Sequence, residues 1–260
     1  MADSQSLESD SFANLLPNIR LIATDMDGTL TAAEKFTPRL FDSLTQLADR
    51  GIPVIVTTGR SAGWVSAIAH YFPIRGAIAE NGGVFFNGAG AAPEPLSDIG
   101  DIAAHRQKLG EFFQQLQQTL PEIVESSDNS FRLTDWTFDV AGLEPEQLDW
   151  LQTTCSANGW GFTYSTVQCH IKPAAQDKAA GLQRVLATYF PTLSCHQVVT
   201  VGDSPNDESM LNQAIFPASV GVANLRKYLD RLSHRPAFLT QAPAVDGFCE
   251  LTRYILDGAI

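Results

Sequence analysis

The chain has 260 residues, of which 44% are hydrophobic and 18% are charged. This length allows one large domain or two unequal ones. The 17 basic residues face 29 acidic ones, and the net charge of -12 argues against partners such as nucleic-acid backbones and anionic membranes. No apolar run approaches the roughly 20 residues of a membrane span, and the four scattered cysteines favour reduced thiols over a disulfide framework or a zinc site. We therefore expect a cytoplasmic protein.

The first 90 residues predict a parallel sheet covered by helices. Residues 1–18 are polar and acidic, lack the basic start and apolar run of a signal peptide, and predict a flexible tail. Residues 19–24 and 52–58 are apolar, β-branched runs that predict buried strands. Between them, Thr37 followed by a proline predicts the start of a helix, and Gly51 predicts its end. A second amphipathic stretch and two apolar runs around an Asn-Gly-Gly turn complete a strand-helix-strand-helix-strand pattern.

The pattern changes after a Gly, Ala and Pro-rich stretch at residues 87–100, which predicts a linker. Residues 102–120 then predict a long helix, and the alternating residues 131–140 predict a strand with one face less buried. A further helix and two short strands follow. This part of the chain predicts an antiparallel sheet with helices, an architecture that differs from the first part.

The α/β pattern resumes with a predicted helix at residues 177–190, a buried strand at residues 197–203 and one more helix after it. We therefore predict an α/β fold with a doubly wound, parallel-sheet (Rossmann-like) core formed by residues 19–90 and 172–260. A smaller α+β domain at residues 91–171 is inserted into this core.

Polar residues follow three of the predicted core strands, at residues 25–27, 57–58 and 203–207. Ligand sites of doubly wound sheets lie beyond the carboxyl ends of the strands. If these strands are neighbours, three or four carboxylates meet in one crevice, and their repulsion requires a cation among them. Oxygen-only ligands favour Mg²⁺. The pattern therefore predicts a magnesium site.

Four motifs in this order resemble those of the haloacid dehalogenase-like superfamily. They are DMDGTLT at residues 25–31, VTTGR at residues 56–60, Lys178 in AAQDKAAGL, and VGDSPNDESML at residues 201–211. The insertion at residues 91–171 resembles the large mixed α/β cap of the subgroup that includes sugar phosphatases, sucrose-phosphate phosphatase and phosphomannomutases, and we call it the cap. The segments AENGG, GVAN and DGF are similar to segments of that subgroup as well.

The resemblance implies catalytic roles for four residues. Asp25 would attack phosphorus and form an aspartyl phosphate. Asp27 would protonate the leaving oxygen and then activate water. Thr58 and Lys178 would hold the transferring phosphoryl group with a hydroxyl group and a positive charge. Thr57 is the alternative to Thr58, although the spacing to the following Gly and Arg favours Thr58, and Lys172 is the structural alternative to Lys178.

The resemblance also implies the ligands of Mg²⁺. The carboxylates of Asp25 and Asp203 and the main-chain carbonyl of Asp27 would bind the ion, while Asn206 and Asp207 would orient its water ligands or the catalytic lysine from behind.

Substrate contacts are expected from Gly59, Arg60, Asn81 and Arg132. Asn81 is equally explained as a turn residue, whereas Arg132 is a basic residue in an acidic protein that could bind a second anionic group. Five further residues of the cap are candidates for stacking against a sugar or contacting its hydroxyl groups, and a structural role is favoured for most of them: Asp135, Trp136, Trp160, Tyr164 and His170.

The main hypothesis is a Mg²⁺-dependent phosphatase that hydrolyses a small phosphorylated metabolite, a sugar phosphate or glycosyl-glycerate phosphate, as a monomer or weak homodimer. The alternatives are a phosphomutase on the same core and a non-catalytic module that binds phosphorylated metabolites. Dehalogenation is disfavoured because Asp27 supplies an acid that this reaction does not need. A nucleotide-cofactor enzyme is disfavoured because no glycine-rich phosphate loop follows the first strand.

Overall fold

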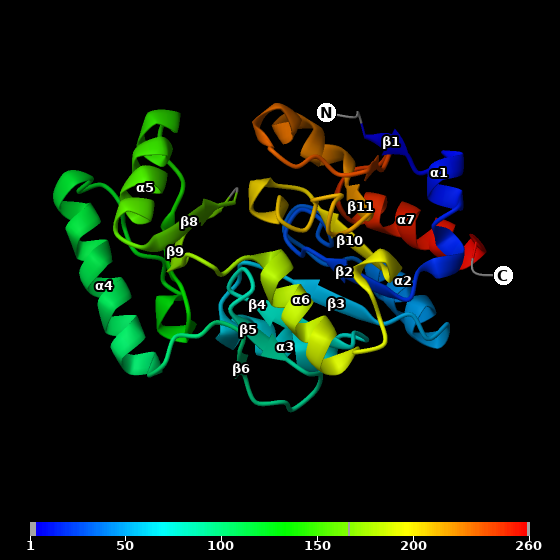
Figure 1. The fold of residues 1–260 in the computed structure, drawn as a ribbon, viewed down its shortest axis with the longest axis horizontal. Helices are drawn as coiled ribbons and strands as arrows, with labels where there is room; N and C mark the ends of the chain where they lie inside the picture. The colour runs from blue at the N-terminus through cyan, green and yellow to red at the C-terminus, as the bar shows by residue number, and fades with distance from the viewer. Residues whose placement is uncertain (1–3, 166, 259–260) are drawn as a thin grey trace.

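A computed structural model describes residues 4–165 and 167–258. The other residues, which include residues 1–3 of the predicted tail, lie outside this description. Figure 1 shows a core and a separate cap, which is drawn in green on the left. Within the described residues the core sheet has nine strands, which pair in the following order: β1 (Gln5–Ser6), β12 (Phe238–Leu239), β11 (Ala218–Gly221), β10 (Val198–Gly202), β2 (Leu21–Thr24), β3 (Val54–Thr57), β4 (Gly76–Ala79), β5 (Val84–Phe86) and β6 (Glu94–Pro95).

The strands from β1 to β4 in this order pair in parallel, and β5 and β6 add an antiparallel edge. β2 lies between β10 and β3, with Thr24 opposite Val201 and Val56. The carboxyl ends of these three strands therefore lie at one edge of the sheet. All residues of β2, β3 and β10 are buried, as expected for central parallel strands.

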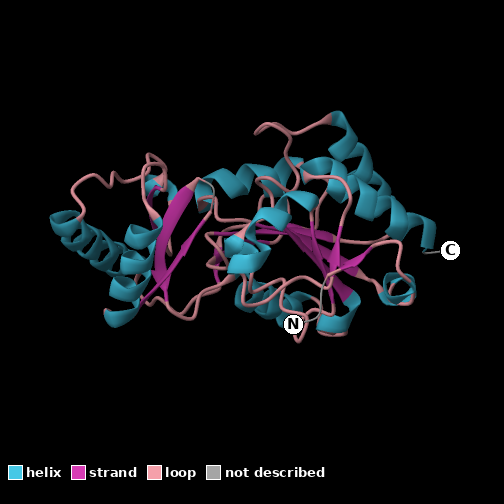
Figure 2. Ribbon diagram, turned by 90° about the horizontal axis from the view of Figure 1, so that it is seen from above, coloured by secondary structure: helices cyan, strands magenta, loops and turns pink. Residues whose placement is uncertain are grey.

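Helices cover both faces of the core sheet, as Figure 2 shows. Leu21 and Ala23 face α6, whereas Ile22 faces the opposite helices, because successive side chains of a strand point to opposite faces. The helices of the core are α1 (Asp10–Ala13), α2 (Pro38–Asp49), α3 (Ala62–Tyr71), α6 (Lys178–Tyr189) and α7 (Ala244–Gly258). Its short 3₁₀ helices are η1 (Leu16–Asn18), η3 (Cys195–Gln197), η4 (Pro205–Asp207) and η5 (Ala223–Arg231). The predicted α/β fold class is confirmed.

The cap contains its own antiparallel sheet and its own hydrophobic core. The sheet pairs in the order β7 (Trp136–Asp139), β9 (Gln168–Pro173) and β8 (Trp160–Tyr164). The helices α4 (Ile102–Thr119) and α5 (Pro145–Ala157) cover one face of it, and η2 (Asn129–Phe131) precedes β7. Trp136, Trp160 and Tyr164 pack against this hydrophobic core, which is the structural role favoured for these aromatic residues.

Residues 4–18 differ from the predicted flexible tail. They form β1, α1 and η1, and Leu7 and Phe12 are buried in the core. The Phe12 ring packs edge-on against Phe238, with 5.0 Å between ring centroids. Burial of two large apolar side chains, each worth about 1.5–3 kcal/mol, holds this segment on the sheet.

Three other predicted segments differ from the structure in their length or type. Residues 131–140 form a strand only from Trp136, because the backbone N–H groups of Leu133 and Thr134 donate to the Glu80 carboxylate of the core. Residues 205–211 form the short η4 and turns instead of a regular helix. β9 extends to Pro173, two residues past the predicted end of the cap. Among the described residues, no helix is both long and apolar enough to cross a bilayer.

Candidate active site

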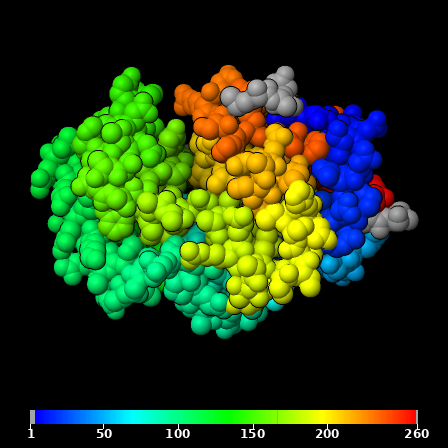
Figure 3. All heavy atoms as spheres, viewed as in Figure 1, coloured from blue at the N-terminus to red at the C-terminus, as the bar shows by residue number. Residues whose placement is uncertain are grey.

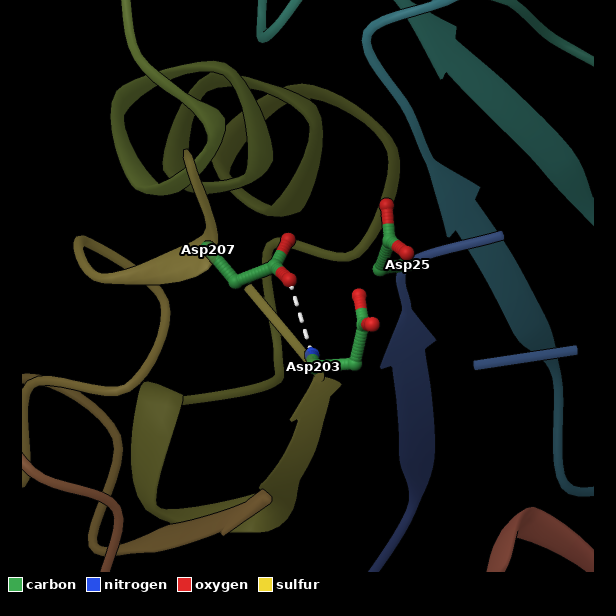
Figure 4. Close-up of side chains that lie close together, drawn as sticks. All are labelled: Asp25, Asp203 and Asp207. Atoms are coloured by element: carbon green, nitrogen blue, oxygen red, sulfur yellow. Dashed lines mark hydrogen bonds between the residues drawn. The ribbon is translucent and has the colours of Figure 1, made fainter. Parts of the chain in front are cut away.

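Three buried aspartates meet at the carboxyl edge of the core sheet. Asp25 follows β2 and Asp203 follows the neighbouring β10, and the backbone N–H of Asp25 donates to the carbonyl of Val201 at 2.9 Å. One carboxylate oxygen from each of Asp25, Asp203 and Asp207 lies within 4.8 Å of the others. Figure 4 shows the carboxylates of Asp25 and Asp203 close together, with Asp207 on the other side of Asp203. The adjacency expected from the strand order is therefore present.

Lys178 is the cation of this cluster. It begins α6, is completely buried, and donates to Asp25 Oδ1 and Asp207 Oδ1, both at 2.6 Å. Burial would lower the pKa of Lys178, but the charges of Asp207 and Asp25 raise it above its usual range. Lys172, the alternative candidate, donates instead to the backbone carbonyl of Gln176. The structure therefore places Lys178 at the cluster and gives Lys172 a structural contact.

Asp207 supports its neighbours with both of its oxygens. One oxygen accepts from Lys178, and the other accepts from the backbone N–H groups of Asp203 at 2.9 Å and Ser204 at 3.1 Å. The bond to Asp203 is the dashed line in Figure 4. Because both oxygens are engaged, Asp207 is suited to orienting Lys178 and the backbone of Asp203.

The arrangement fits a divalent cation. Asp203 Oδ1 is buried and has no hydrogen-bond partner among the described residues. Burial, with a further contribution from Asp207, raises the pKa of Asp203 to about 7. Burial also raises the pKa of Asp25, and Asp207 adds to the effect. Since Lys178 offsets only one of the three negative charges, a cation such as Mg²⁺ bound by Asp25 and Asp203 would balance the site.

Two residues contact Asp203 although the sequence predicts no role for them. Asn224, in the GVAN segment, donates to Asp203 Oδ2 at 2.7 Å and to the carbonyl of Gly28 at 3.1 Å. Gly28 has a φ of +81°, and a Cβ at this position would lie 2.4 Å from Asp203 Oδ2. Only glycine satisfies both the left-handed backbone and the close approach of the carboxylate. The GVAN motif was the signal that could have indicated Asn224.

Asp27 is held by Arg60 at the wall of the site. The guanidinium donates from Nε and Nη2 to the two carboxylate oxygens, at 2.9 and 2.8 Å. Both side chains are 31% exposed. The hydrogen bond from Asp27 raises the pKa of Arg60, and the Arg60 guanidinium also lies 5.4 Å from the centre of the Trp64 ring. A two-pronged ion pair of this kind fixes the direction of the Asp27 carboxylate.

The loop after β3 carries Thr58 and is braced by the turn between β4 and β5. The backbone N–H of Asn81 donates to the carbonyl of Thr58 at 2.9 Å, and that of Glu80 donates to the carbonyl of Arg60 at 3.0 Å. Thr58 lines the site cavity, whereas Thr57 is not among its lining residues. This position favours Thr58 over Thr57 as the hydroxyl that contacts a phosphoryl group.

Asn81 forms the turn, and its side chain contacts Asn206 at the edge of the site. Its φ of +52° is left-handed, which asparagine tolerates. Its side-chain oxygen accepts from Asn206 Nδ2 at 3.2 Å, while its buried Nδ2 has no hydrogen-bond partner among the described residues. This Nδ2 could donate to a ligand, so the ligand contact remains a prediction for Asn81 beside its role in the turn.

Glu80 ties the core to the cap, a role that the sequence did not indicate. Its carboxylate accepts from the backbone N–H of Ala62 at the start of α3 and from those of Leu133 and Thr134 in the cap. The Thr134 hydroxyl donates to it at 2.7 Å. Burial raises the pKa of Glu80. One buried carboxylate therefore links the start of α3 in the core to the cap.

Arg132 does not reach the site cavity, although a substrate contact was expected from it. Its guanidinium is fully buried, pairs with Asp128 and Asp135 at 2.9 Å each, and donates to the carbonyl of Gly59 at 3.0 Å. Two carboxylates already neutralise its charge. Arg132 is absent from the residues that line the cavity. It holds the cap against the loop after β3 instead of facing a second anionic group.

The cavity above Asp25 and Asp27 has a volume of about 30 Å³ and is closed by the cap. Gly59, Arg60, Ser204 and Asn206 line its core side. Its cap side is formed by Ser165, Val167, Gln168 and His170. A second cavity of about 260 Å³ lies between the cap and the core beside Lys178, and Figure 3 shows the surface hollowed between the green cap and the yellow and orange core. A space of 30 Å³ holds a few waters, so a whole substrate requires the cap to shift.

Comparisons with known proteins identify relatives of this chain. A family model described as haloacid dehalogenase-like hydrolase matches residues 22–92. A phosphoglycolate phosphatase of Methanothrix thermoacetophila is 30% identical over 211 residues, covering 79% of this chain and 85% of that protein. A phosphoglycolate phosphatase of Thermoplasma acidophilum is 25% identical over 202 residues, covering 77% of this chain and 84% of that protein.

Solved structures share the fold. A crystal structure of the Thermoplasma acidophilum protein 0175 has a TM-score of 0.73 at 21% identity, covering 91% of this chain and 98% of that one. The sucrose-phosphatase of Synechocystis, solved in complex with sucrose and phosphate, has a TM-score of 0.67 at 16% identity, covering 90% of this chain and 97% of that one. With the sequence relatives above, these findings show that the chain belongs to the haloacid dehalogenase-like hydrolases and is a phosphatase of that family.

Proposed function

We propose that this phosphatase depends on Mg²⁺ and hydrolyses a small phosphorylated metabolite through an aspartyl phosphate on Asp25. The observation that carries the proposal is the buried cluster of three aspartates and one lysine, in which Asp203 Oδ1 has no hydrogen-bond partner within the described part of the chain. A buried carboxylate oxygen without a donor is costly unless a cation occupies its free side.

The carboxylates of Asp25 and Asp203 and the main-chain carbonyl of Asp27 would hold Mg²⁺. When bound, the ion would supply positive charge to the phosphoryl oxygens and so make a carboxylate competent to attack phosphorus. Lys178, which already donates to Asp25, would add a second positive charge at the same place. Asp207 keeps Lys178 and Asp203 in position.

In the first step, Asp25 attacks phosphorus, and the ester bond to the leaving oxygen breaks. Asp27 enters this step in its protonated form, gives its proton to the leaving oxygen and becomes a carboxylate. In the second step this carboxylate takes a proton from the water that hydrolyses the aspartyl phosphate, which returns Asp27 to the protonated form. Arg60 keeps the Asp27 carboxylate at the cavity wall. The Thr58 hydroxyl donates to a phosphoryl oxygen during both steps.

The substrate is proposed to be small and is bound near Gly59, Arg60 and Asn81. The cap covers the aspartates, which supports a substrate small enough to be enclosed once the cap has shifted. The names of the curated relatives add phosphoglycolate to the sugar phosphates and glycosyl-glycerate phosphates that the sequence motifs suggest. All three classes belong in the substrate panel.

The test measures phosphate release from an aryl phosphate and from this panel, with Mg²⁺ and with EDTA. The wild type should require Mg²⁺, and Asp25→Asn should lower the rate by at least about 10³-fold because the nucleophile is lost. Asp49→Asn, an exposed acidic residue at the end of α2, is the matched control and should retain full activity.

If neither the wild type nor Asp25→Asn releases phosphate from any compound, the proposed hydrolysis is contradicted. Product analysis would then address the phosphomutase alternative, in which the phosphoryl group returns to the sugar instead of passing to water. Retained binding of Mg²⁺ and a sugar phosphate without any turnover would instead favour the non-catalytic module.

A further inference from the structure

His170 is a residue of the cap whose ring reaches the catalytic loop of the core. In β9, Cys169 and Ile171 point into the hydrophobic core of the cap, so the intervening His170 points to the opposite face. The side chain is buried and lines the cavity above the aspartates. A Cβ added to Gly59 would lie 3.1 Å from the ring Cε1 and 3.2 Å from Nε2. This edge of the ring therefore lies against Gly59, between Thr58 and Arg60 in the sequence.

Asp135 fixes the direction of the His170 ring. His170 Nδ1 lies 2.8 Å from Asp135 Oδ2, and Arg132 holds the same carboxylate at 2.9 Å. An ionised carboxylate only accepts hydrogen bonds, so Nδ1 carries a proton. In the neutral ring Nε2 is then an acceptor. Among residues 4–165 and 167–258, Nε2 has no hydrogen-bond partner.

The surroundings favour the neutral ring. Burial lowers the pKa of His170, and the hydrogen bond and charge of Asp135 oppose this effect, while Arg132 adds to it. Arg132 already balances the charge of Asp135. A neutral ring offers a lone pair at Nε2, and a lone pair attracts a hydroxyl hydrogen but repels a carboxylate oxygen.

We propose that His170 determines substrate specificity by accepting, at Nε2, a hydrogen bond from a hydroxyl group of the leaving alcohol. The inference rests on the proposed phosphatase function and narrows its substrate class to hydroxylated phosphoesters. His170 lines the same cavity as Thr58, Arg60 and Asp27. In the proposed reaction Asp27 protonates the leaving oxygen, so a group that contacts Nε2 would belong to the leaving alcohol.

Three phosphoesters of nearly equal size test the inference: ethylene glycol monophosphate, which carries a hydroxyl group, phosphoglycolate, which carries a carboxylate, and ethyl phosphate, which carries neither. The wild type should prefer the glycol ester over ethyl phosphate by about tenfold or more in kcat/KM, the effect of one well-formed hydrogen bond. Phosphoglycolate should be no better than ethyl phosphate.

His170→Asn keeps a donor toward Asp135 and removes the acceptor at the Nε2 position. We expect the ratio of kcat/KM for the glycol ester to kcat/KM for ethyl phosphate to fall to about one, whatever change in kcat/KM the two esters share. His170→Gln, whose side-chain carbonyl reaches farther, should restore part of the preference. These results would support recognition by Nε2.

An equal loss on all three esters in His170→Asn would overturn the inference and leave a positioning role. A wild type that prefers phosphoglycolate, or that does not distinguish the glycol ester from ethyl phosphate, would overturn it as well. If the wild type releases no phosphate even from an aryl phosphate with Mg²⁺, the proposed function itself fails, and the inference fails with it.

Discussion

Removal of divalent cations should make the protein lose stability as the pH rises, because Asp203 is buried without a cation to balance its charge. The pKa of Asp203 is raised to about 7 in the folded protein, against about 4 in an unfolded chain. Between these values the native state binds the extra proton, so the free energy of unfolding falls with increasing pH. The loss spans the window from about pH 4 to about pH 7.

The magnitude follows from the size of the shift. Each pH unit inside the window costs about 1.4 kcal/mol for one group. Between about pH 5 and about pH 8, Asp203 alone therefore lowers the free energy of unfolding by about 3 kcal/mol. The raised pKa of Asp25 acts in the same direction. Saturating Mg²⁺ should reduce the loss, because the ion stabilises the folded state in which the carboxylates are ionised.

The assay is urea unfolding at about pH 5 and about pH 8, in EDTA and in Mg²⁺, for the wild type and two variants. Asp203→Asn removes the titrating group and should show a loss smaller by about 3 kcal/mol in EDTA. Asp49→Asn, an exposed acid of α2, should behave like the wild type. A wild-type stability in EDTA that is constant or rises over this window, or an unchanged loss in Asp203→Asn, would refute the reasoning.

Three other substitutions test separate contacts. Lys178→Met leaves two buried carboxylates without their cation and should lower the free energy of unfolding in EDTA by roughly 3–5 kcal/mol, with partial recovery in Mg²⁺, as measured by urea unfolding. Gly28→Ala forces a Cβ against Asp203 and should weaken Mg²⁺ binding by at least about tenfold in calorimetry. Glu80→Gln places an amide donor among the donors of Thr134 and its neighbours, and should cost roughly 1–3 kcal/mol and speed proteolysis around the cap.

A control variant and three contrary outcomes would test these expectations. Gly51→Ala carries a comparable backbone penalty at a φ of +70° but meets nothing within 4 Å, so its Mg²⁺ affinity should stay unchanged. Equal effects of Gly28→Ala and Gly51→Ala would show that contact with Asp203 is unimportant. An unaltered stability of Lys178→Met in EDTA would mean that the two carboxylates are not ionised together. If Glu80→Gln is cleaved at the same rate as the wild type, Glu80 does not hold the cap in place.

The sequence predicted the centre of the fold because its signals there are local. β2 and β10 are continuous apolar runs that end in aspartate, and the rule for parallel strands brings their carboxyl ends together. This rule brings Asp25 and Asp203 together, and the structure shows them side by side. The place of Lys178 beside them was implied by the resemblance alone.

The errors concern contacts between distant segments. Glu80 reads as part of an Asn-Gly turn, and nothing near it reveals that its partners are Leu133 and Thr134. The order of residues 4–18 depends on the distant strand β12, which receives β1 and the Phe12 ring. Arg132 differs, because aspartates four residues before it and three after it were a local sign of neutralisation.

The pairing of β2 with β10 has a consequence for the folding of the chain. Asp25 and Asp203 lie on opposite sides of the cap in the sequence, so the catalytic centre forms only when a very long loop closes. The cap is contiguous and has its own hydrophobic core, so its contacts are shorter in range and form faster. A cap that becomes compact early shortens the effective loop that β2 and β10 must close.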